Sequence, residues 1–460
     1  MPLKTLHLTN SWHETSGGVA TFYRALIEAA SGRGHNIRLV VPGGSDRVEE
    51  VGDCAKIYHV ESQRAPLNPH YRMIFPKQFF PAGSAVQKIL IAERPDVVEI
   101  CDKYTLNYFG AVLRRGLLDG VKFRPIVIGL SCERMDDNFR SYLGRIPLAQ
   151  TFCAGYMRWA YFPFFDHHIA NSPYTAEELR EASRGHLVAR HVWIRPMGVN
   201  TSHLSPARRT PEARRRLLRT SGGRADSVLL LYVGRLVPEK NLPLLFHLLV
   251  HLVGTAKRDY RLLVAGDGID RGKWETFCQR YAPGRATFLG HLADPSELAD
   301  LLANADGFIH PNPREPFGIA PLEAMASGLP LVAPNEGGVA SYASPENAWI
   351  APAHVEGFAS ALEEMLANEF ERSRRVKNAL QTSAQYRWDN VAASFLNLYA
   401  DLHAMAMNQS DLVPAPAFSS TPAKSLRLAW LRGVSQSAEG IFRLVSTFPS
   451  RANPNPLQPR

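Results

Sequence analysis

Two glutamates, Glu315 and Glu323, stand eight positions apart in one stretch of the chain. If a helix begins near Gly318, Glu315 lies in the preceding loop and Glu323 in the second helical turn, so the two carboxylates reach different parts of one ligand. The backbone amides of Phe317, Gly318 and Ile319 then point outward at the helix N-terminus, where free donors and the helix dipole favour an anion. Such a segment could hold a phosphorylated sugar.

Two cations, Arg235 and Lys240, follow the apolar run Val228–Val233. The planar guanidinium of Arg235 can bridge two phosphate oxygens, and the ammonium of Lys240 supplies a compact charge. A departing diphosphate requires both kinds of contact. An isolated arginine or lysine is more often a solvated loop cation, but a position directly after a predicted strand favours the phosphate-binding interpretation.

Short apolar runs alternate with longer amphipathic ones along the chain, which is the rhythm of repeated β-α units. The predicted strands are Thr5–Leu8, Ile37–Val41, Val97–Ile100, Ile126–Leu130 and His168–Ala170, then Val228–Val233, Arg261–Ala265, Gly307–His310 and Leu329–Ala333. The series restarts near residue 200, so we expect an α/β protein with two doubly wound, Rossmann-like domains facing each other across a cleft. Functional residues should follow the strands, because such sheets bind ligands outside the carboxyl ends of their strands.

The expected domains cover residues 1–200 and 201–385, and a helix over 386–408 crosses back to the first domain. The last segment, 409–460, is rich in Pro, Ser and Ala and is expected to be poorly ordered. Within it, Leu426–Val445 carries apolar residues at helical spacing beside basic ones. This pattern indicates either a loosely docked segment or a helix lying on a membrane surface.

The glutamate pair with its Pro-Phe-Gly core, followed by Ala326–Pro330 and Asn335–Gly338, resembles the donor-site block of the retaining GT-B glycosyltransferase family 4. Segments elsewhere are also similar to that family: Gly234–Asn241, Ile169–Thr175 and Pro196–Asn200. The similarity extends over about residues 1 to 405. It implies the GT-B fold and a hexosyltransferase that uses a GDP- or UDP-linked sugar donor. The acceptor would be a glycan or glycolipid, and the anomeric configuration would be retained.

By the same resemblance, Glu315 approaches the transferred sugar, Glu323 accepts the ribose hydroxyls, and Arg235 and Lys240 hold the diphosphate. The catalytic candidates are therefore Glu315, Arg235 and Lys240. The other donor-binding candidates are Gly18, Gly266, Leu289, Phe317, Gly318, Ile319 and Glu323. Of these, Gly266 and Leu289 match the loops around the nucleotide base. No metal or other cofactor is expected, since the chain lacks a D-x-D triplet, a phosphate-binding GxxxxGK[ST] loop and a complete dinucleotide fingerprint.

The acceptor-side candidates are Gly17, Gly18, Ser131, Glu133 and Arg134. The glycine pair stands between the first predicted strand and its helix, where the family has a glycine-rich loop, although a simple tight turn would explain it equally well. After the fourth predicted strand the family often has a histidine near the reacting sugar. Here the position is Ser131, which cannot carry a proton at neutral pH. Glu133 or Arg134 could compensate, and ordinary loop polarity is the alternative.

Composition limits the classes of partner. The 460 residues, 45% hydrophobic and 21% charged, suit a folded chain of two domains with spare length. The 52 basic and 43 acidic residues give a net charge of +9. Because these basic residues are spread out, we expect no nucleic-acid partner, whereas an anionic membrane surface stays open.

The sequence also bears on location. Its five cysteines are far apart and include no C-x-x-C pair, and neither a secretory signal nor a membrane-spanning apolar run is evident. We therefore expect a cytoplasmic protein able to bind the inner face of the membrane. Aromatic residues gather at Phe75–Phe80 and Tyr156–Phe165. They indicate core packing, or, if partly exposed, a lipid-linked acceptor.

Two other functions are compatible with this pattern. A GT-B sugar-nucleotide epimerase would convert the donor without an acceptor. A catalytically silent protein that kept the fold would bind carbohydrate or lipid, an alternative suggested by Ser131. Acceptor-dependent release of a nucleoside diphosphate separates these two functions from glycosyl transfer.

Overall fold

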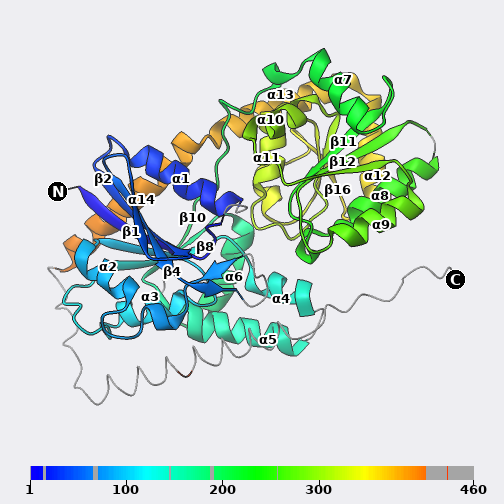
Figure 1. Ribbon diagram of the computed structural model, residues 1–460. Helices are drawn as coiled ribbons and strands as arrows, with labels where there is room; N and C mark the ends of the chain where they lie inside the picture. The colour runs from blue at the N-terminus through cyan, green and yellow to red at the C-terminus, as the bar shows by residue number, and fades with distance from the viewer. Residues whose placement is uncertain are drawn as a thin grey trace.

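The computed structural model describes residues 2–13, 17–65, 71–143, 147–186, 191–255, 257–410 and 433. These residues form two lobes, each built on a mainly parallel sheet covered by helices (Figure 1). The expected α/β architecture with two doubly wound, Rossmann-like sheets is confirmed. Among the described residues, no helix combines the length and the apolar composition needed to cross a bilayer.

The first domain holds an eight-stranded sheet in the order β10-β9-β8-β7-β1-β2-β4-β3. Its strands are β1 (Leu3–Thr9), β2 (His35–Gly43), β3 (Arg47–Val51), β4 (Ala55–Glu61), β7 (Val97–Cys101), β8 (Ile126–Ser131), β9 (His167–Ala170) and β10 (Val192–Ile194). Only the edge pair of β3 and β4 is antiparallel within this sheet. A separate antiparallel ribbon is formed by β5 (Gln63–Arg64) and β6 (Arg72–Met73). The strand order reverses between β1 and β7, which is where such sheets open a ligand crevice.

Helices pack around this sheet: α1 (Gly18–Ala30), α2 (Ala85–Glu93), α3 (Asn107–Arg114), α4 (Met135–Leu143), α5 (Pro147–Tyr156) and α6 (Pro173–Ser183). Short helical turns are η1 (Pro76–Gln78), η2 (Met157–Tyr161) and η3 (Phe162–Phe164). Helix α1 begins at the second residue of the Gly17–Gly18 pair.

The second domain holds six parallel strands in the order β13-β12-β11-β14-β15-β16. They are β11 (Val228–Val233), β12 (Tyr260–Ala265), β13 (Ala286–Gly290), β14 (Gly307–Ile309), β15 (Leu331–Pro334) and β16 (Trp349–Ala351). Its larger helices are α7 (Pro211–Thr220), α8 (Leu242–Thr255), α9 (Arg271–Tyr281), α10 (Pro295–Asn304), α11 (Ile319–Ala326), α12 (Val355–Ala367) and α13 (Glu369–Gln385). Short turns are η4 (Pro206–Arg208), η5 (Pro238–Lys240) and η6 (Gly338–Ser341). The central strand β11 reads as a continuous apolar run because both faces of the sheet are covered.

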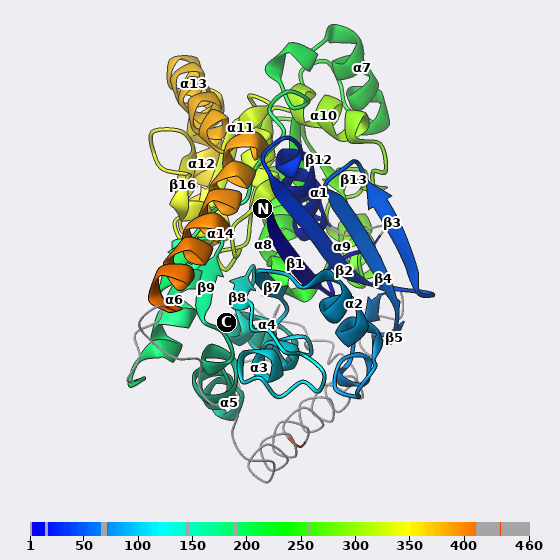
Figure 2. The same ribbon diagram turned by 90° about the vertical axis from the view of Figure 1, so that its left-hand side faces the viewer.

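The long helix α14 (Trp388–Ser410) leaves the second domain and packs along α1 of the first (Figures 1 and 2). Phe395 of α14 packs on Phe22 of α1, with ring centroids 4.7 Å apart. Tyr399 donates a hydrogen bond to Glu99 in the buried centre of the first sheet. Burial of each such aromatic side chain stabilises the fold by roughly 2 kcal/mol, so α14 fastens the domains together.

Several boundaries differ from the sequence prediction. Strand β14 ends at Ile309, one residue before His310, and β15 begins at Leu331 rather than Leu329. Leu289 lies within β13, not in a loop. The prediction also missed β3, β4, β5, β6, β10, β13 and β16. Of these, β5, β6, β10 and β16 have only two or three residues, too few for a reliable alternation of apolar and polar residues. The expected tail, 409–460, lies outside the described residues except for positions 409, 410 and 433.

Candidate active site

Glu315 lies in the loop between β14 and α11, where neighbouring side chains hold its carboxylate. Lys240 places Nζ 2.8 Å from both carboxylate oxygens, and the amide of Asn312 donates a 3.1 Å hydrogen bond to Oε2. His310 is buried beside this cluster, and within the described chain its Nε2 has no hydrogen-bond partner. The structure thus brings together two of the three predicted catalytic candidates, Glu315 and Lys240.

These neighbours determine the protonation of the cluster. Burial favours the neutral form of Glu315, but the charge of Lys240, with help from His310 and Asn312, outweighs it and lowers the pKa of Glu315 to about 2. Burial lowers the pKa of His310 to about 4; Glu315 opposes this shift and Lys240 adds to it. At neutral pH the site therefore contains an ionised glutamate beside a neutral histidine.

The loop after β11 positions Lys240. The hydroxyl of Tyr232 donates a 3.0 Å hydrogen bond to the carbonyl of Arg235. Asn241 adopts a left-handed conformation with φ of 51°, and its side-chain amide donates to the carbonyl of Pro311 at 2.8 Å. The loop after β11 is thereby fastened to the loop after β14, the neighbouring strand, so Lys240 and Glu315 meet at one edge of the sheet.

Arg235 lies farther from the cluster than Lys240 does. Its guanidinium is 3.1 Å from Oε1 of Glu239, and its side chain is 53% exposed. The recorded ion pair of Arg235 is with Glu239, whereas Lys240 pairs with Glu315. An exposed, flexible guanidinium can still turn toward a ligand, and its contact with a diphosphate stays a prediction.

The start of α11 is built on Gly318. Its φ of 90° is a conformation that side-chain-bearing residues rarely adopt, and a Cβ there would lie 2.8 Å from Val339. Tyr342 donates a hydrogen bond to the Gly318 carbonyl, and the amide of Gly338 donates to the carbonyl of Glu315 at 2.6 Å. Phe317 is buried against Tyr342, with ring centroids 5.3 Å apart. The helix N-terminus is therefore held rigidly next to Glu315.

The first domain meets this helix through Gly18, the first residue of α1. A Cβ on Gly18 would lie 2.4 Å from Cδ1 of Ile319, the first residue of α11, whereas a Cβ on Gly17 would have no neighbour within 4 Å. Gly18 thus permits a close approach between the two domains at the donor side. Gly17 and Gly18 are placed as predicted, at the end of the loop that follows β1.

Glu323 lies in the second turn of α11 and is partly exposed. Burial raises the pKa of its carboxyl to about 7. No hydrogen bond or ion pair is recorded for this carboxylate within the described residues, which leaves both oxygens available to a ligand. A ribose diol would supply the missing donors.

Gly266 and Leu289 lie beside the loop that carries Arg235. A Cβ on Gly266 would lie 2.0 Å from the carbonyl oxygen of Gly234, and the Gly266 amide donates to the carbonyl of Gly290 at 2.7 Å. Leu289 precedes Gly290 on β13 and is partly buried. The carboxyl ends of β11, β12 and β13 therefore lie together at one edge of the sheet.

The acceptor-side candidates at the end of β8 are engaged within the first domain. The Ser131 hydroxyl donates to the carbonyl of Glu133 at 3.1 Å, and Asn138 donates to the Glu133 carboxylate at 2.8 Å. Arg134 forms a bidentate pair with Asp136, at 3.0 and 2.7 Å. Burial raises the pKa of Glu133, with Lys103 opposing. These side chains hold the loop together, and their contact with an acceptor stays a prediction.

Two contacts across the cleft were missed by sequence reasoning. Ser172 of the first domain donates a 2.5 Å hydrogen bond to the carbonyl of Pro316, and Arg314 lies 3.5 Å from a carboxylate oxygen of Asp137. Both partners in the second domain flank Glu315. No periodicity signals such long-range pairs, whereas Asn312 and His310 could have been suspected from their proximity to Glu315 in the sequence.

The predicted lack of a metal stays untested. Over the described ranges, no group of three or more His, Cys, Asp and Glu side chains is arranged to hold a metal ion. The charges that face the Glu315 cluster come instead from Lys240 and the helix N-terminus.

Comparisons with known proteins agree with this arrangement. The profile described as Glycosyl transferases group 1 matches residues 214–382, and that of Glycosyltransferase Family 4 matches residues 16–203. A GDP-mannose-dependent alpha-(1-6)-phosphatidylinositol dimannoside mannosyltransferase of Mycobacterium tuberculosis is 28% identical over 407 residues, covering 88% of this chain and 97% of that protein. A GDP-mannose-dependent alpha-mannosyltransferase of the same species is 30% identical over 334 residues, covering 70% and 76%.

Among solved structures, sucrose-phosphate synthase from Thermosynechococcus elongatus superposes with a TM-score of 0.69 at 21% identity. The match covers 88% of this chain and all of that one. The two Rossmann-like domains form the GT-B fold, and the expected fold class is confirmed. The chain belongs to glycosyltransferase family 4, the glycosyl transferases group 1. It is a glycosyltransferase.

Proposed function

We propose that this glycosyltransferase transfers a mannosyl unit from GDP-mannose to a lipid-linked glycan acceptor, with retention of the anomeric configuration. The donor is supported by the two mannosyltransferases described above, both GDP-mannose-dependent by name. The acceptor class is supported by the relative named for phosphatidylinositol dimannoside, which this chain matches over 97% of its length.

The observation that carries the proposal is the Lys240–Glu315 pair in the loop before α11, whose first residue, Ile319, lies close to Gly18 of the first domain. This arrangement places a cation and a fixed carboxylate beside the start of α11. A nucleoside-diphosphate sugar carries groups that match this arrangement: a diphosphate for the cation and the start of the helix, and sugar hydroxyls for the carboxylate.

The chemistry follows from charge. As the glycosidic bond breaks, negative charge grows on the diphosphate, and Lys240, Arg235 and the amides near Gly318 stabilise it. The acceptor hydroxyl attacks the face from which the diphosphate leaves, so no protein nucleophile is needed. Domain closure through Ser172 and Arg314 excludes water and limits donor hydrolysis.

Each glutamate has a separate role in this proposal. Glu315, held ionised by Lys240, accepts hydrogen bonds from hydroxyls of the transferred sugar. Glu323, which has no protein partner recorded in the described chain, accepts the ribose hydroxyls. Gly266 and Leu289 border the space for the base.

Exposed aromatic side chains support a lipid-linked acceptor. Phe152 on α5 is 42% exposed and Trp159 on η2 is 64% exposed, while most of the surrounding aromatic cluster is buried. Large apolar side chains at a surface suit the boundary of a bilayer. We propose that the surface around Phe152 and Trp159 binds an anionic membrane.

The test is release of GDP from GDP-mannose by the full-length protein, with and without lipid-linked mannosides from a bacterial membrane extract. The proposal expects acceptor-dependent GDP release and retention in the product. Isomerised donor without acceptor would favour the epimerase, and GDP-mannose binding without turnover on any acceptor would favour the silent binder. UDP-sugar use in place of GDP-mannose would overturn the donor assignment.

A further inference from the structure

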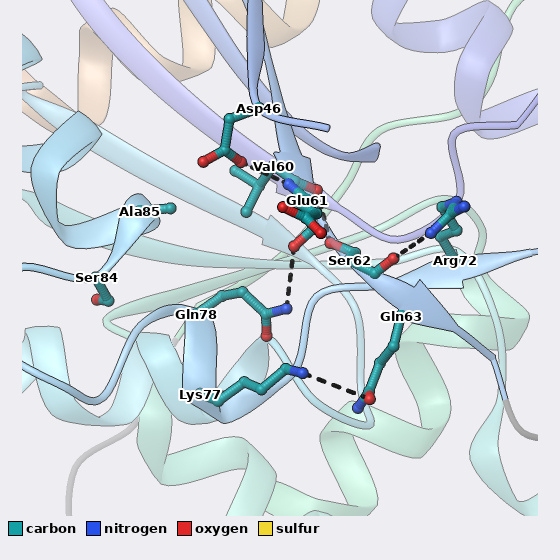
Figure 3. Close-up of a pocket in the computed structure, with 10 residues that line it drawn as sticks. All are labelled: Asp46, Val60, Glu61, Ser62, Gln63, Arg72, Lys77, Gln78, Ser84 and Ala85. Carbon is teal, nitrogen blue, oxygen red and sulfur yellow. Dashed lines mark hydrogen bonds between the residues drawn. The ribbon is translucent and has the colours of Figure 1, made fainter. Parts of the chain in front are cut away.

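A hollow lies in the first domain, apart from the Lys240–Glu315 cluster. Its volume is about 450 Å³, within the range of roughly 300–1,000 Å³ typical of small-molecule sites. Figure 3 shows side chains from the end of β4, the β5–β6 ribbon, η1 and the start of α2 around it. Its lining residues are Asp46, Val60, Glu61, Ser62, Gln63, Arg72, Lys77, Gln78, Ser84 and Ala85.

The lining is polar but has no net charge. Two carboxylates, Asp46 and Glu61, are balanced by two cations, Arg72 and Lys77. Side-chain amides and hydroxyls supply further donors and acceptors. Each hydroxyl group of a sugar both donates and accepts, which suits such a mixed lining, whereas the two carboxylates would repel a phosphate.

The walls are fixed by hydrogen bonds between lining residues. Arg72 donates a 2.5 Å hydrogen bond to the carbonyl of Ser62, Gln78 donates to the carbonyl of Glu61 at 3.2 Å, and Asp46 accepts from the Glu61 amide at 2.6 Å. These contacts hold β4, the ribbon and η1 in one arrangement (Figure 3). In a preformed site of this kind, little binding free energy is lost to the ordering of side chains.

Three groups remain available to a ligand. No hydrogen bond or ion pair is recorded for the Glu61 carboxylate in the described chain. Oγ of Ser84 is buried and without a recorded partner there, although Ser84 stands at the N-cap position of α2. The recorded side-chain contact of Lys77 is a long one, 3.5 Å to Gln63. One carboxylate, one hydroxyl and one ammonium can therefore serve hydroxyl groups of a ring.

The hollow lies on the acceptor side of the molecule. It is at the carboxyl ends of β2 and β4, the edge from which the loop after β1 leads to Gly18. Neighbouring strands are about 4.8 Å apart, so β4 is roughly 10 Å from β1. The amide of Ile74, after β6, donates to Oδ1 of Asn10, after β1, at 2.8 Å, which ties the segment after the ribbon to the start of the loop after β1.

We propose that this hollow binds a neutral polyol ring, a sugar or a cyclitol, in the part of the acceptor remote from the hydroxyl that receives the transferred sugar. The place of this subsite in the reaction rests on the proposed function, while ring binding does not. Glu61 accepts hydrogen bonds from ring hydroxyls, and Lys77 and Ser84 donate to them.

Ring binding is tested on the full-length protein by saturation-transfer NMR with methyl α-mannoside, myo-inositol and inorganic phosphate as probes. At least one ring should bind, about tenfold more weakly in Glu61→Gln and Lys77→Ala. The matched controls Glu28→Gln and Lys122→Ala change exposed charges elsewhere and should bind as the wild type does. Lack of ring binding, equal binding in all variants, or displacement of the ring by phosphate would each overturn the proposal.

Kinetics then test the place of the subsite. With the acceptor identified by GDP release, Glu61→Gln and Lys77→Ala should raise the acceptor KM about tenfold, with much smaller changes in kcat and donor KM. An unchanged acceptor KM would remove the hollow from the acceptor path even if ring binding holds. If the protein transfers no sugar at all, the proposed function fails, and the NMR result still decides whether the hollow binds a ring.

Discussion

The ammonium of Lys240 lies 2.8 Å from both carboxylate oxygens of Glu315, although the two residues follow different strands. The pair joins the loops after β11 and β14 at the point where the strand order of the second sheet reverses. A ligand phosphate that approaches Lys240 therefore approaches a cation whose position is already fixed by Glu315. Binding and catalysis at this point depend on both partners.

Lys240→Ala should lower kcat for GDP release at least about 100-fold, because it removes a charge that stabilises the leaving diphosphate. It also leaves the buried Glu315 without its cation, so the pKa of Glu315 should rise. Steady-state kinetics measure the first effect. Lys377→Ala, an exposed lysine on α13, is the control and should retain full activity. Equal rates in the two variants would contradict the role of Lys240.

Glu323 should make stability depend on pH. Burial raises its pKa from 4.5 in the unfolded chain to about 7, so its favourable contribution is complete below pH 4.5 and is lost as pH rises through 7. Glu323→Gln should therefore match the wild type at pH 4 and be more stable at pH 8 by up to about 3 kcal/mol.

Urea unfolding of both proteins at the two pH values measures this difference. Glu181→Gln on the exposed face of α6 is the control and should show no such pH dependence. If Glu323→Gln were less stable than the wild type at pH 8, the folded protein would favour the ionised carboxylate of Glu323, which contradicts the raised pKa.

Gly18→Val should impair transfer more than it impairs stability. A Cβ at Gly18 would lie 2.4 Å from Cδ1 of Ile319, so the added side chain must displace the Ile319 side chain at the start of α11. We expect kcat to fall at least about tenfold with a Tm near that of the wild type. Gly17→Ala, whose Cβ has no neighbour within 4 Å, should have little effect.

A double variant checks the cause. Ile319→Ala removes the opposing methyl group, so it should recover part of the activity lost in Gly18→Val, and the two changes should not be additive. Strict additivity of the two effects on kcat would indicate that Gly18 acts through something other than contact with Ile319.

Tyr399→Phe should weaken the attachment of α14 to the first domain. The tyrosine hydroxyl donates to Glu99, which also accepts from Tyr23 at 3.1 Å and lies 3.0 Å from Nδ1 of His7. Loss of one donor to a buried carboxylate should lower the free energy of unfolding by about 2 kcal/mol. Tyr281→Phe, at a 40% exposed tyrosine on α9, is the control for chemical denaturation. Equal unfolding curves would show that α14 is held by apolar packing alone.

Features that depend on the local pattern of residues could be predicted from the sequence. Nine strands and the placement of Glu315 and Glu323 around the α11 N-terminus follow from apolar runs, glycine positions and spacing. The Arg314–Asp137 and Ser172–Pro316 contacts join segments far apart in the sequence, and local pattern holds no information on them. The Ser131 hydroxyl donates to the backbone of Glu133 two residues further on, a contact that apolar patterning does not specify, and the place of Ser131 beside the acceptor stays a prediction.

The most direct test of the central claim is a thermal-shift comparison of wild-type and Lys240→Ala protein with GDP, GDP-mannose, UDP, ADP and NAD. A ligand that binds only the folded state raises its apparent stability. We predict a selective rise in Tm of the wild type with GDP, larger with GDP-mannose and strongly reduced in Lys240→Ala. Equal shifts in both proteins, or no shift with any nucleoside diphosphate at saturating concentration, would contradict a donor site at Lys240 and Glu315.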